Sequence, residues 1–64
     1  MDSMIVKVIY KNQPQEVMIT KGGMTREAIS AAGIKSTDVK RIYVTGISVC
    51  WETPLRANDI LFVE

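Results

Sequence analysis

The residue types that carry most enzymatic chemistry are scarce in this sequence. It contains no histidine, which removes the commonest general base near neutral pH and every nucleophile–histidine pair. Its one cysteine, Cys50, stands beside Trp51 with no cationic run next to it, so we expect a packed or half-packed thiol and not a nucleophile. A zinc site needs about four Cys, His or carboxylate ligands, which one cysteine and scattered acids do not supply. The sequence therefore predicts a protein that is not an enzyme and holds no metal or cofactor.

Two short patterns are candidate binding sites. Lys21-Gly22-Gly23 could hold an anion on free N–H groups ahead of a helix, but the full phosphate-loop spacing is missing and a bare Gly-Gly is more often a tight turn. Lys40-Arg41 with Tyr43 offers two cations and a stacking ring, although such a pair is usually the solvated start of a strand. The net charge of +1 supplies no field for a polyanion, so nucleic acid is an unlikely partner.

Length and composition predict one small domain. Sixty-four residues cannot divide a core in two, and we expect residues 4–64 to form the domain, with Met1 to Ser3 as a leader or disordered start. The first apolar run is broken by Lys7 and is far shorter than the roughly 20 residues of a membrane span, so no membrane partner is expected. A single cysteine forms no internal disulfide and suits a reducing compartment, which predicts a cytoplasmic location.

The first twenty residues have the pattern of a β-hairpin. Met4 to Tyr10 is rich in β-branched residues and alternates, and Gln15 to Thr20 resumes the pattern after the turn residues Asn12 to Pro14. A lysine is almost never fully buried without a partner. Lys7 therefore places its own side of the first strand outward and the opposite side toward the core.

A short helix is predicted from Arg26 to Ala32. Thr25 stands where an N-cap residue would be, and Glu27 lies in the first turn, near the positive end of the helix dipole. Isolated helices below about 12 to 15 residues are marginal, so this one must be packed on a sheet.

Ile29 is predicted to anchor that helix. It is spaced to form a hydrophobic staple with Met24, and Gly33 stands where a C-terminal glycine would end the helix. The apolar residue after that glycine, Ile34, would then reach back to Ile29.

The second half of the chain predicts three more strands. Arg41 to Thr45 and a short strand within Ile47 to Trp51 precede Pro54, which ends any pairing, and Asn58-Asp59 leads into Ile60 to Val63. The last segment is apolar on both faces and must therefore lie inside a sheet. Pairing it in parallel beside the first strand gives an α+β fold with a four- or five-stranded mixed sheet and one main helix, the β-grasp (ubiquitin-like) layout.

The stretch VTGISVCWETPLRANDILFVE resembles the second half of the small sulfur-carrier proteins of thiamine and molybdopterin synthesis. Thr45-Gly46, Leu55 and Asn58-Asp59 occupy the places of that family's turns and bend. The resemblance implies the same fold and, for a carrier, a C-terminal Gly-Gly whose carboxylate is adenylated and thiocarboxylated. This sequence ends instead in Phe62-Val63-Glu64; if that is the mature terminus, we expect no substrate atom for the carrier reaction.

Strand alternation also predicts an apolar surface opposite the helix. Its members are Ile5, Ile9, Met18, Tyr43, Ile60 and Phe62, with Lys7, Lys11 and Arg41 as a charged rim. A contiguous surface of this kind serves a partner or self-association. We therefore expect a non-catalytic adaptor or inhibitor that binds a protein partner, or a second copy of itself, through this face. The alternatives are a sulfur-carrier-like protein lacking the Gly-Gly tail and a weak nucleic-acid binder.

One ambiguity concerns the phase of the last strand. Its four apolar residues carry no alternation, so the sequence also allows the opposite phase, in which Leu61 and Val63 would lie on the binding face.

Overall fold

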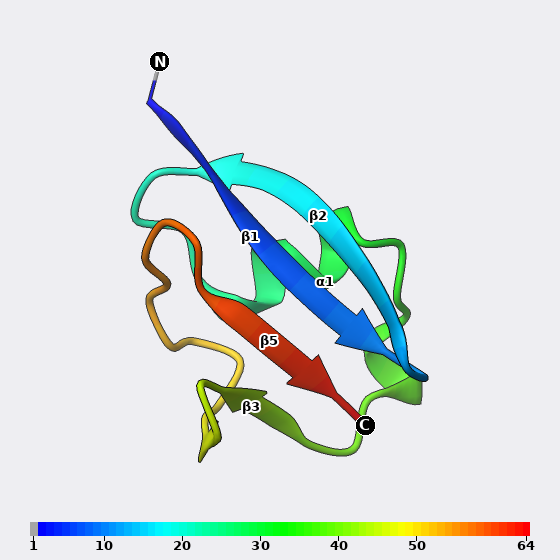
Figure 1. The fold of residues 1–64 in the computed structure, drawn as a ribbon. Helices are drawn as coiled ribbons and strands as arrows, with labels where there is room; N and C mark the ends of the chain where they lie inside the picture. The colour runs from blue at the N-terminus through cyan, green and yellow to red at the C-terminus, as the bar shows by residue number, and fades with distance from the viewer. Residues whose placement is uncertain (1) are drawn as a thin grey trace.

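The structure, a computed structural model that describes residues 2–64, is an α+β arrangement of one five-stranded mixed sheet with a helix across one face (Figure 1). The strands lie in the order β2-β1-β5-β3-β4. This arrangement is compatible with a β-grasp-like fold. The elements are β1 (Ser3–Tyr10), β2 (Gln13–Thr20), α1 (Thr25–Ala31), a 3-10 turn η1 (Ser36–Asp38), β3 (Ile42–Val44), β4 (Ile47–Ser48) and β5 (Ile60–Val63).

The N-terminal hairpin is present, but its turn differs from the prediction. Lys11 and Asn12 form a two-residue turn with φ of 53° and 63°, the conformation that matches the twist of paired strands. Pro14, expected in the turn, lies inside β2 opposite Ile9. The sheet tolerates it there because β2 is an edge strand, where a proline nitrogen that faces outward removes no ladder hydrogen bond.

The first strand also begins earlier than expected. Ser3 belongs to β1 and pairs with Thr20, and the carbonyl of Asp2 accepts a hydrogen bond from the Lys21 N–H at 3.1 Å. Ser3 is therefore part of the sheet and not of a leader. Met1, the remaining residue of that predicted leader, lies outside the described residues.

The last strand is central, as predicted. β5 pairs in parallel with β1 and antiparallel with β3, so it has a neighbour on each side. Leu61 and Val63 are buried on the helix side, whereas Ile60 and Phe62 are exposed on the other, which confirms the predicted phase. The core between sheet and helix comprises Met4, Val6, Val8, Val17, Ile19, Ala28, Ile29, Ile42, Leu55, Leu61 and Val63.

The helix begins one residue earlier than predicted, and its N-cap prediction is wrong. Met24 is the N-cap and has no side-chain capping bond. Thr25 is instead fully buried, and both its backbone N–H and its Oγ1 hydroxyl donate to the carbonyl of Thr53, each at 3.0 Å. The hydroxyl therefore donates to a carbonyl of the segment before β5, whereas an N-cap hydroxyl accepts from an N–H of the first helical turn.

The end of the helix follows the prediction. Gly33, with φ of 80°, donates to the Ser30 carbonyl at 3.0 Å, and the Ile34 N–H donates to the Ile29 carbonyl at 3.2 Å. These two bonds form a Schellman motif. Ile34 packs against the core and Ile29 is buried, so the predicted anchor is confirmed.

The segment between β4 and β5 is held against the start of α1. The Arg26 N–H donates to the Trp51 carbonyl at 3.0 Å, and the Leu55 N–H donates to the Gly23 carbonyl at 2.9 Å. Gly23 has no room for a side chain, because a Cβ there would stand 2.6 Å from Glu27 Oε2 and 2.8 Å from the Thr20 carbonyl. This glycine is thus required by close packing.

Replacing Ile29 with alanine should lower the free energy of unfolding by about 2 to 5 kcal/mol, because a buried isoleucine would leave a cavity between helix and sheet. Urea unfolding measures this effect. Ile47→Ala is the matched control, since Ile47 is 68% exposed and its truncation removes no core contact. Equal stability losses in the two variants would contradict the packing described here.

Replacing Thr45 with asparagine should raise the free energy of unfolding by roughly 1 kcal/mol. Thr45 has φ of 53° and is exposed, and a β-branched residue is strained in the left-handed region that asparagine accepts. Gly46→Ala should have the opposite effect, because Gly46 has φ of 79° and open space around it. Thermal unfolding measures both effects. If the two variants change the melting temperature in the same direction, backbone strain is not the cause of the stability changes.

Candidate interaction surface

The face of the sheet opposite α1 carries a row of three large side chains. Ile9 on β1 is the register partner of Phe62 on β5, and Phe62 is in turn the partner of Tyr43 on β3. Phe62 is 45% exposed, while Ile9 and Tyr43 are half-buried. A shallow hollow of about 560 Å³ lies along these three residues, and the turns at Lys11 and Gly46 contribute to its walls.

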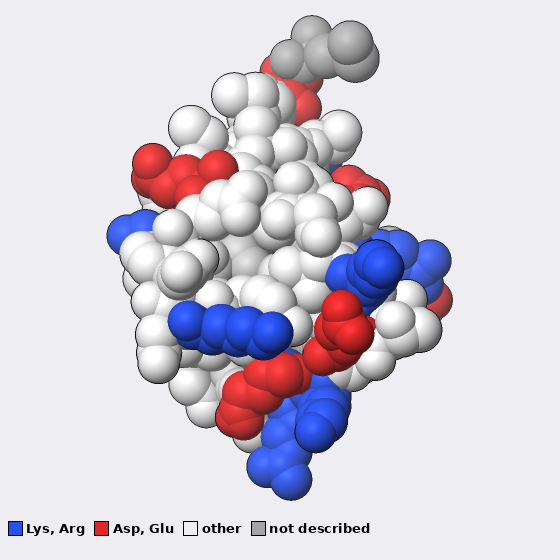
Figure 2. Space-filling view, turned by 90° about the vertical axis from the view of Figure 1, so that its right-hand side faces the viewer, with Lys and Arg blue, Asp and Glu red and all other residues white. Residues whose placement is uncertain are grey.

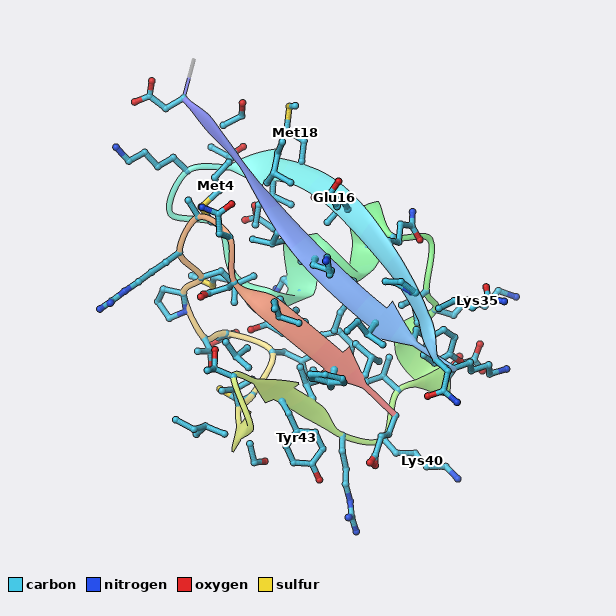
Figure 3. All side chains as sticks on the ribbon, in the orientation of Figure 1. Met4, Glu16, Met18, Lys35, Lys40 and Tyr43 are labelled. Carbon is cyan, nitrogen blue, oxygen red and sulfur yellow. The ribbon has the colours of Figure 1, made fainter. Side chains whose placement is uncertain are left out.

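A second apolar group lies on the same face toward the other end of β1. Ile5 pairs with Met18 of β2, and the two side chains are 45% and 64% exposed. Figure 3 shows Met18 and Tyr43 on strands that flank β1 and β5 on opposite sides. We call the set Ile5, Ile9, Met18, Tyr43, Ile60 and Phe62 the outer face; the structure places all six predicted members on it.

Lys7 was predicted to lie on the rim of this surface, and that position is wrong. It is half-buried on β1 between Ile5 and Ile9, with Glu16 of β2 on one side and Ile60 of β5 on the other. Interfaces favour cations at their edge, but Lys7 is on β1, which has β2 on one side and β5 on the other and so lies inside the sheet. The outer face therefore has two apolar groups, with Lys7, Glu16 and Ile60 in the band between them.

Arg41 does lie at the border of the outer face. It flanks β3, and its backbone exchanges hydrogen bonds with Glu64, N–H to carbonyl at 3.1 and 2.9 Å. The neighbouring Tyr43 phenol, followed by the charge of Glu64, raises the pKa of the Arg41 guanidinium. Lys11 is exposed in the hairpin turn, with Nζ 5.3 Å from the centroid of the Tyr10 ring.

Two exposed apolar side chains were missed from the sequence. Ile47 on β4 pairs with Val44 and lies on the helix side of the sheet, where α1 does not reach; it is 68% exposed. Met24, the helix N-cap, is 39% exposed beside its bridge to Pro54. The sequence carried no signal for Ile47, because the predicted strand ran to Trp51, whereas β4 ends at Ser48 and lies at the sheet edge.

Two of the three N–H groups of the Lys21-Gly22-Gly23 turn are used within the chain, and Lys21 N–H donates to the Asp2 carbonyl. Gly23 N–H donates to the Thr20 carbonyl at 2.8 Å, and the first N–H groups of α1 donate to carbonyls of Thr53 and Trp51. The side-on view in Figure 2 shows acidic and basic side chains interspersed, with no broad area of one sign. Neither feature supports a polyanion site.

The cysteine is placed differently from the prediction of a packed thiol. Cys50 is exposed, with Sγ 3.4 Å from the Thr53 hydroxyl oxygen, because its segment lies on the surface outside the strands. A hydrogen bond from Thr53, followed by one from the Glu52 backbone, lowers the pKa of the Cys50 thiol.

Residues 2–64 contain no group of three or more His, Cys, Asp or Glu side chains that could hold a metal ion. Within the same residues, no helix has the length and apolar character needed to cross a membrane. Comparison with known proteins finds no matching family model and no significantly similar curated protein.

Replacing Thr53 with valine should raise the pKa of Cys50, because the hydroxyl that stabilises the thiolate is lost. The rate of alkylation by iodoacetamide follows the thiolate fraction. Its midpoint should therefore move to higher pH in Thr53→Val, and the rate at neutral pH should fall. Thr20→Val, at an exposed threonine on β2 outside the segment that holds Cys50, is the control; an unchanged pH profile in Thr53→Val would contradict the assignment.

Proposed function

We propose that this chain is a non-catalytic protein-interaction module of the β-grasp (ubiquitin-like) type, which binds a protein partner through the outer face. The row of Ile9, Phe62 and Tyr43 across three adjacent strands is the observation that carries the proposal. Clusters of aromatic and aliphatic side chains around a hollow are the usual centres of binding energy in protein interfaces.

Burial of the outer face in a complex would supply substantial binding energy. Apolar surface contributes about 25 cal/mol per Å² when it leaves water, and fully burying one large apolar side chain is worth roughly 1.5 to 3 kcal/mol. Phe62 and Ile5, each 45% exposed, and Met18, 64% exposed, have area left to bury. The fold does not need these side chains in its core, so they are available to a partner.

Lys7 sets a condition on that partner. A partner covering both apolar groups also covers the Lys7 ammonium, which lies between them. A desolvated cation without a hydrogen-bond acceptor is strongly unfavourable. The Glu16 carboxylate lies across from Lys7 on β2, so a partner that covers both residues either leaves this pair in contact or supplies an acceptor to Lys7 and a donor to Glu16.

Replacing Phe62 with aspartate should abolish partner binding while leaving the fold intact. The side chain points away from α1, and the new carboxylate would be desolvated in the interface without a partner. Affinity capture from native lysate with intact protein and with Phe62→Asp, followed by thermal unfolding of both, measures the two effects.

The matched control is Ile47→Asp. It introduces the same charge at an exposed apolar position on the other side of the sheet, where Ile47 is 68% exposed against 45% for Phe62. We expect Ile47→Asp to capture the same partner as the intact protein. Loss of binding in both variants, or in neither, would show that the outer face is not the binding surface.

A sulfur-carrier function is a second candidate, favoured by the turn geometry. Thr45 and Gly46 have φ of 53° and 79°, and Asn58 has φ of 70°, at the turns on which the resemblance to that family rests. Intact-mass measurement of the protein from its native host tests this candidate. A C-terminal Gly-Gly extension, or replacement of one oxygen by sulfur, would support it, and the mass of the printed sequence would exclude it.

A further inference from the structure

The strand β2 has one edge without a neighbour. β1 lies on one side of it, and β2 is the first strand in the sheet order. In an antiparallel ladder, alternate residues turn their N–H and C=O groups toward the partner strand. The two-residue hairpin pairs Tyr10 with Gln13, and Lys21 N–H donates to Asp2, so the odd-numbered residues of β2 face β1.

The even-numbered residues of β2 therefore face the open edge. Their free groups are the N–H groups of Glu16, Met18 and Thr20 and the carbonyls of Pro14, Glu16 and Met18; the Thr20 carbonyl already accepts from Gly23. Proline supplies no N–H, so the open edge runs from Glu16 to Thr20. Its unpaired groups match the hydrogen-bonding pattern of one added strand.

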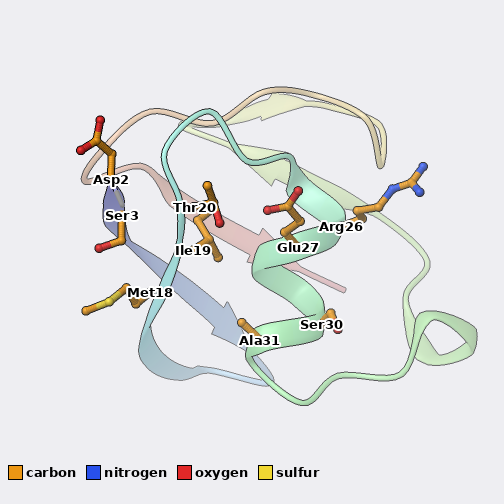
Figure 4. A pocket seen from close by; sticks show the side chains of 9 residues that line it. All are labelled: Asp2, Ser3, Met18, Ile19, Thr20, Arg26, Glu27, Ser30 and Ala31. Atoms are coloured by element: carbon orange, nitrogen blue, oxygen red, sulfur yellow. The ribbon is translucent and has the colours of Figure 1, made fainter.

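A groove runs beside this edge, between β2 and α1 (Figure 4). Its volume is about 790 Å³, and it is lined mainly by Met18 and Ile19 of β2 and by Glu27, Ser30 and Ala31 of α1. Ser30 and Ala31 are small and exposed, which leaves room between helix and strand. A strand added to β2 would direct alternate side chains into this groove.

The groove favours a peptide over a second copy of the chain. If two β2 strands met edge to edge, the residues of the second copy facing the helix side would be its Val17 and Ile19. These are already buried in their own core, at 6% exposure each, and could not fill the groove. An extended peptide has no core of its own, so its alternate side chains are free to enter.

The charges at one end of the groove select a basic peptide. Asp2 and Glu27 lie at the Thr20 end, and in Figure 4 the Glu27 side chain turns toward Thr20 whereas Arg26 points away from β2. Arg26 is held by an ion pair with Glu52, its Nη2 2.5 Å from Oε1. The two carboxylates are therefore left to interact with a ligand of opposite charge.

We propose that the β2 edge binds an extended peptide that adds as a sixth strand, with small apolar side chains at alternate positions and a lysine or arginine beside Asp2 and Glu27. This site shares Met18 with the outer face but none of the row formed by Ile9, Phe62 and Tyr43, so substitutions in that row test the two sites independently.

Titration of the ¹⁵N-labelled protein with a blocked peptide of alternating valine and threonine, with lysine at both ends, tests this proposal. The amide signals of Glu16, Met18, Thr20 and Ala31 should shift, because the first three face the added strand and the last lines the groove. A peptide with glutamate at both ends should bind at least about threefold more weakly at low salt, where charge interactions are least screened. This difference should disappear in the Asp2→Asn, Glu27→Gln variant.

Three protein variants separate the edge from other surfaces. Glu16→Pro removes one outward N–H at a position equivalent to that of Pro14, and Ser30→Arg fills the groove from the helix; each should weaken peptide binding at least about tenfold if the edge is the site. Phe62→Asp, on the outer face, should bind the peptide normally.

Four results would overturn the proposal. They are the absence of shifts at millimolar peptide, shifts confined to Ile9, Tyr43 and Phe62, equal binding of the two peptides, and edge signals that move with protein concentration when no peptide is present. The last result would show a second copy at the edge instead.

Discussion

One buried threonine joins the two halves of this chain. Thr25 is fully buried, and its N–H and hydroxyl both donate to the Thr53 carbonyl. A helix of seven residues cannot persist alone, and here its first N–H groups are satisfied by the segment that follows β4. That segment has no regular strand pairing of its own between β4 and β5. The helix start and the segment therefore depend on each other.

This contact also affects which residues lie on the outer face, because the segment that it holds leads directly into β5 and sets the register of that strand. The segment ends at Asn58-Asp59, where Asn58 N–H donates to the Ile5 carbonyl at 2.8 Å and Lys7 N–H donates to the Asp59 carbonyl at 2.9 Å. These bonds fix which residues of β5 stand beside β1. A slip of one residue would exchange Phe62 for Leu61 on the outer face and place Phe62 in the core.

The sequence was sufficient for features that depend on local chemistry. Lys7 determined the faces of β1 because its ammonium must reach water, and Gly33 marked the helix end because its left-handed conformation favours glycine. The sequence was insufficient where a group far along the chain competes for the same hydrogen-bonding side chain. Threonine is a residue type that favours the N-cap, but the Thr25 hydroxyl donates to a carbonyl 28 residues away. The outer face was predicted correctly in membership, whereas the central position of Lys7 required the strand order.

The two edges of the sheet differ in length, and this difference limits how copies of the chain could associate. β2 offers eight residues at one edge, whereas β4 offers two at the other. A fibril that grows by edge-to-edge strand pairing needs two competent edges on each subunit, because every copy must join a neighbour on both sides. This sheet has one such edge, and Pro14 shortens it further. Any pairing of copies through β2 would end at two molecules, which protects a protein with an apolar outer face from polymerising through its backbone.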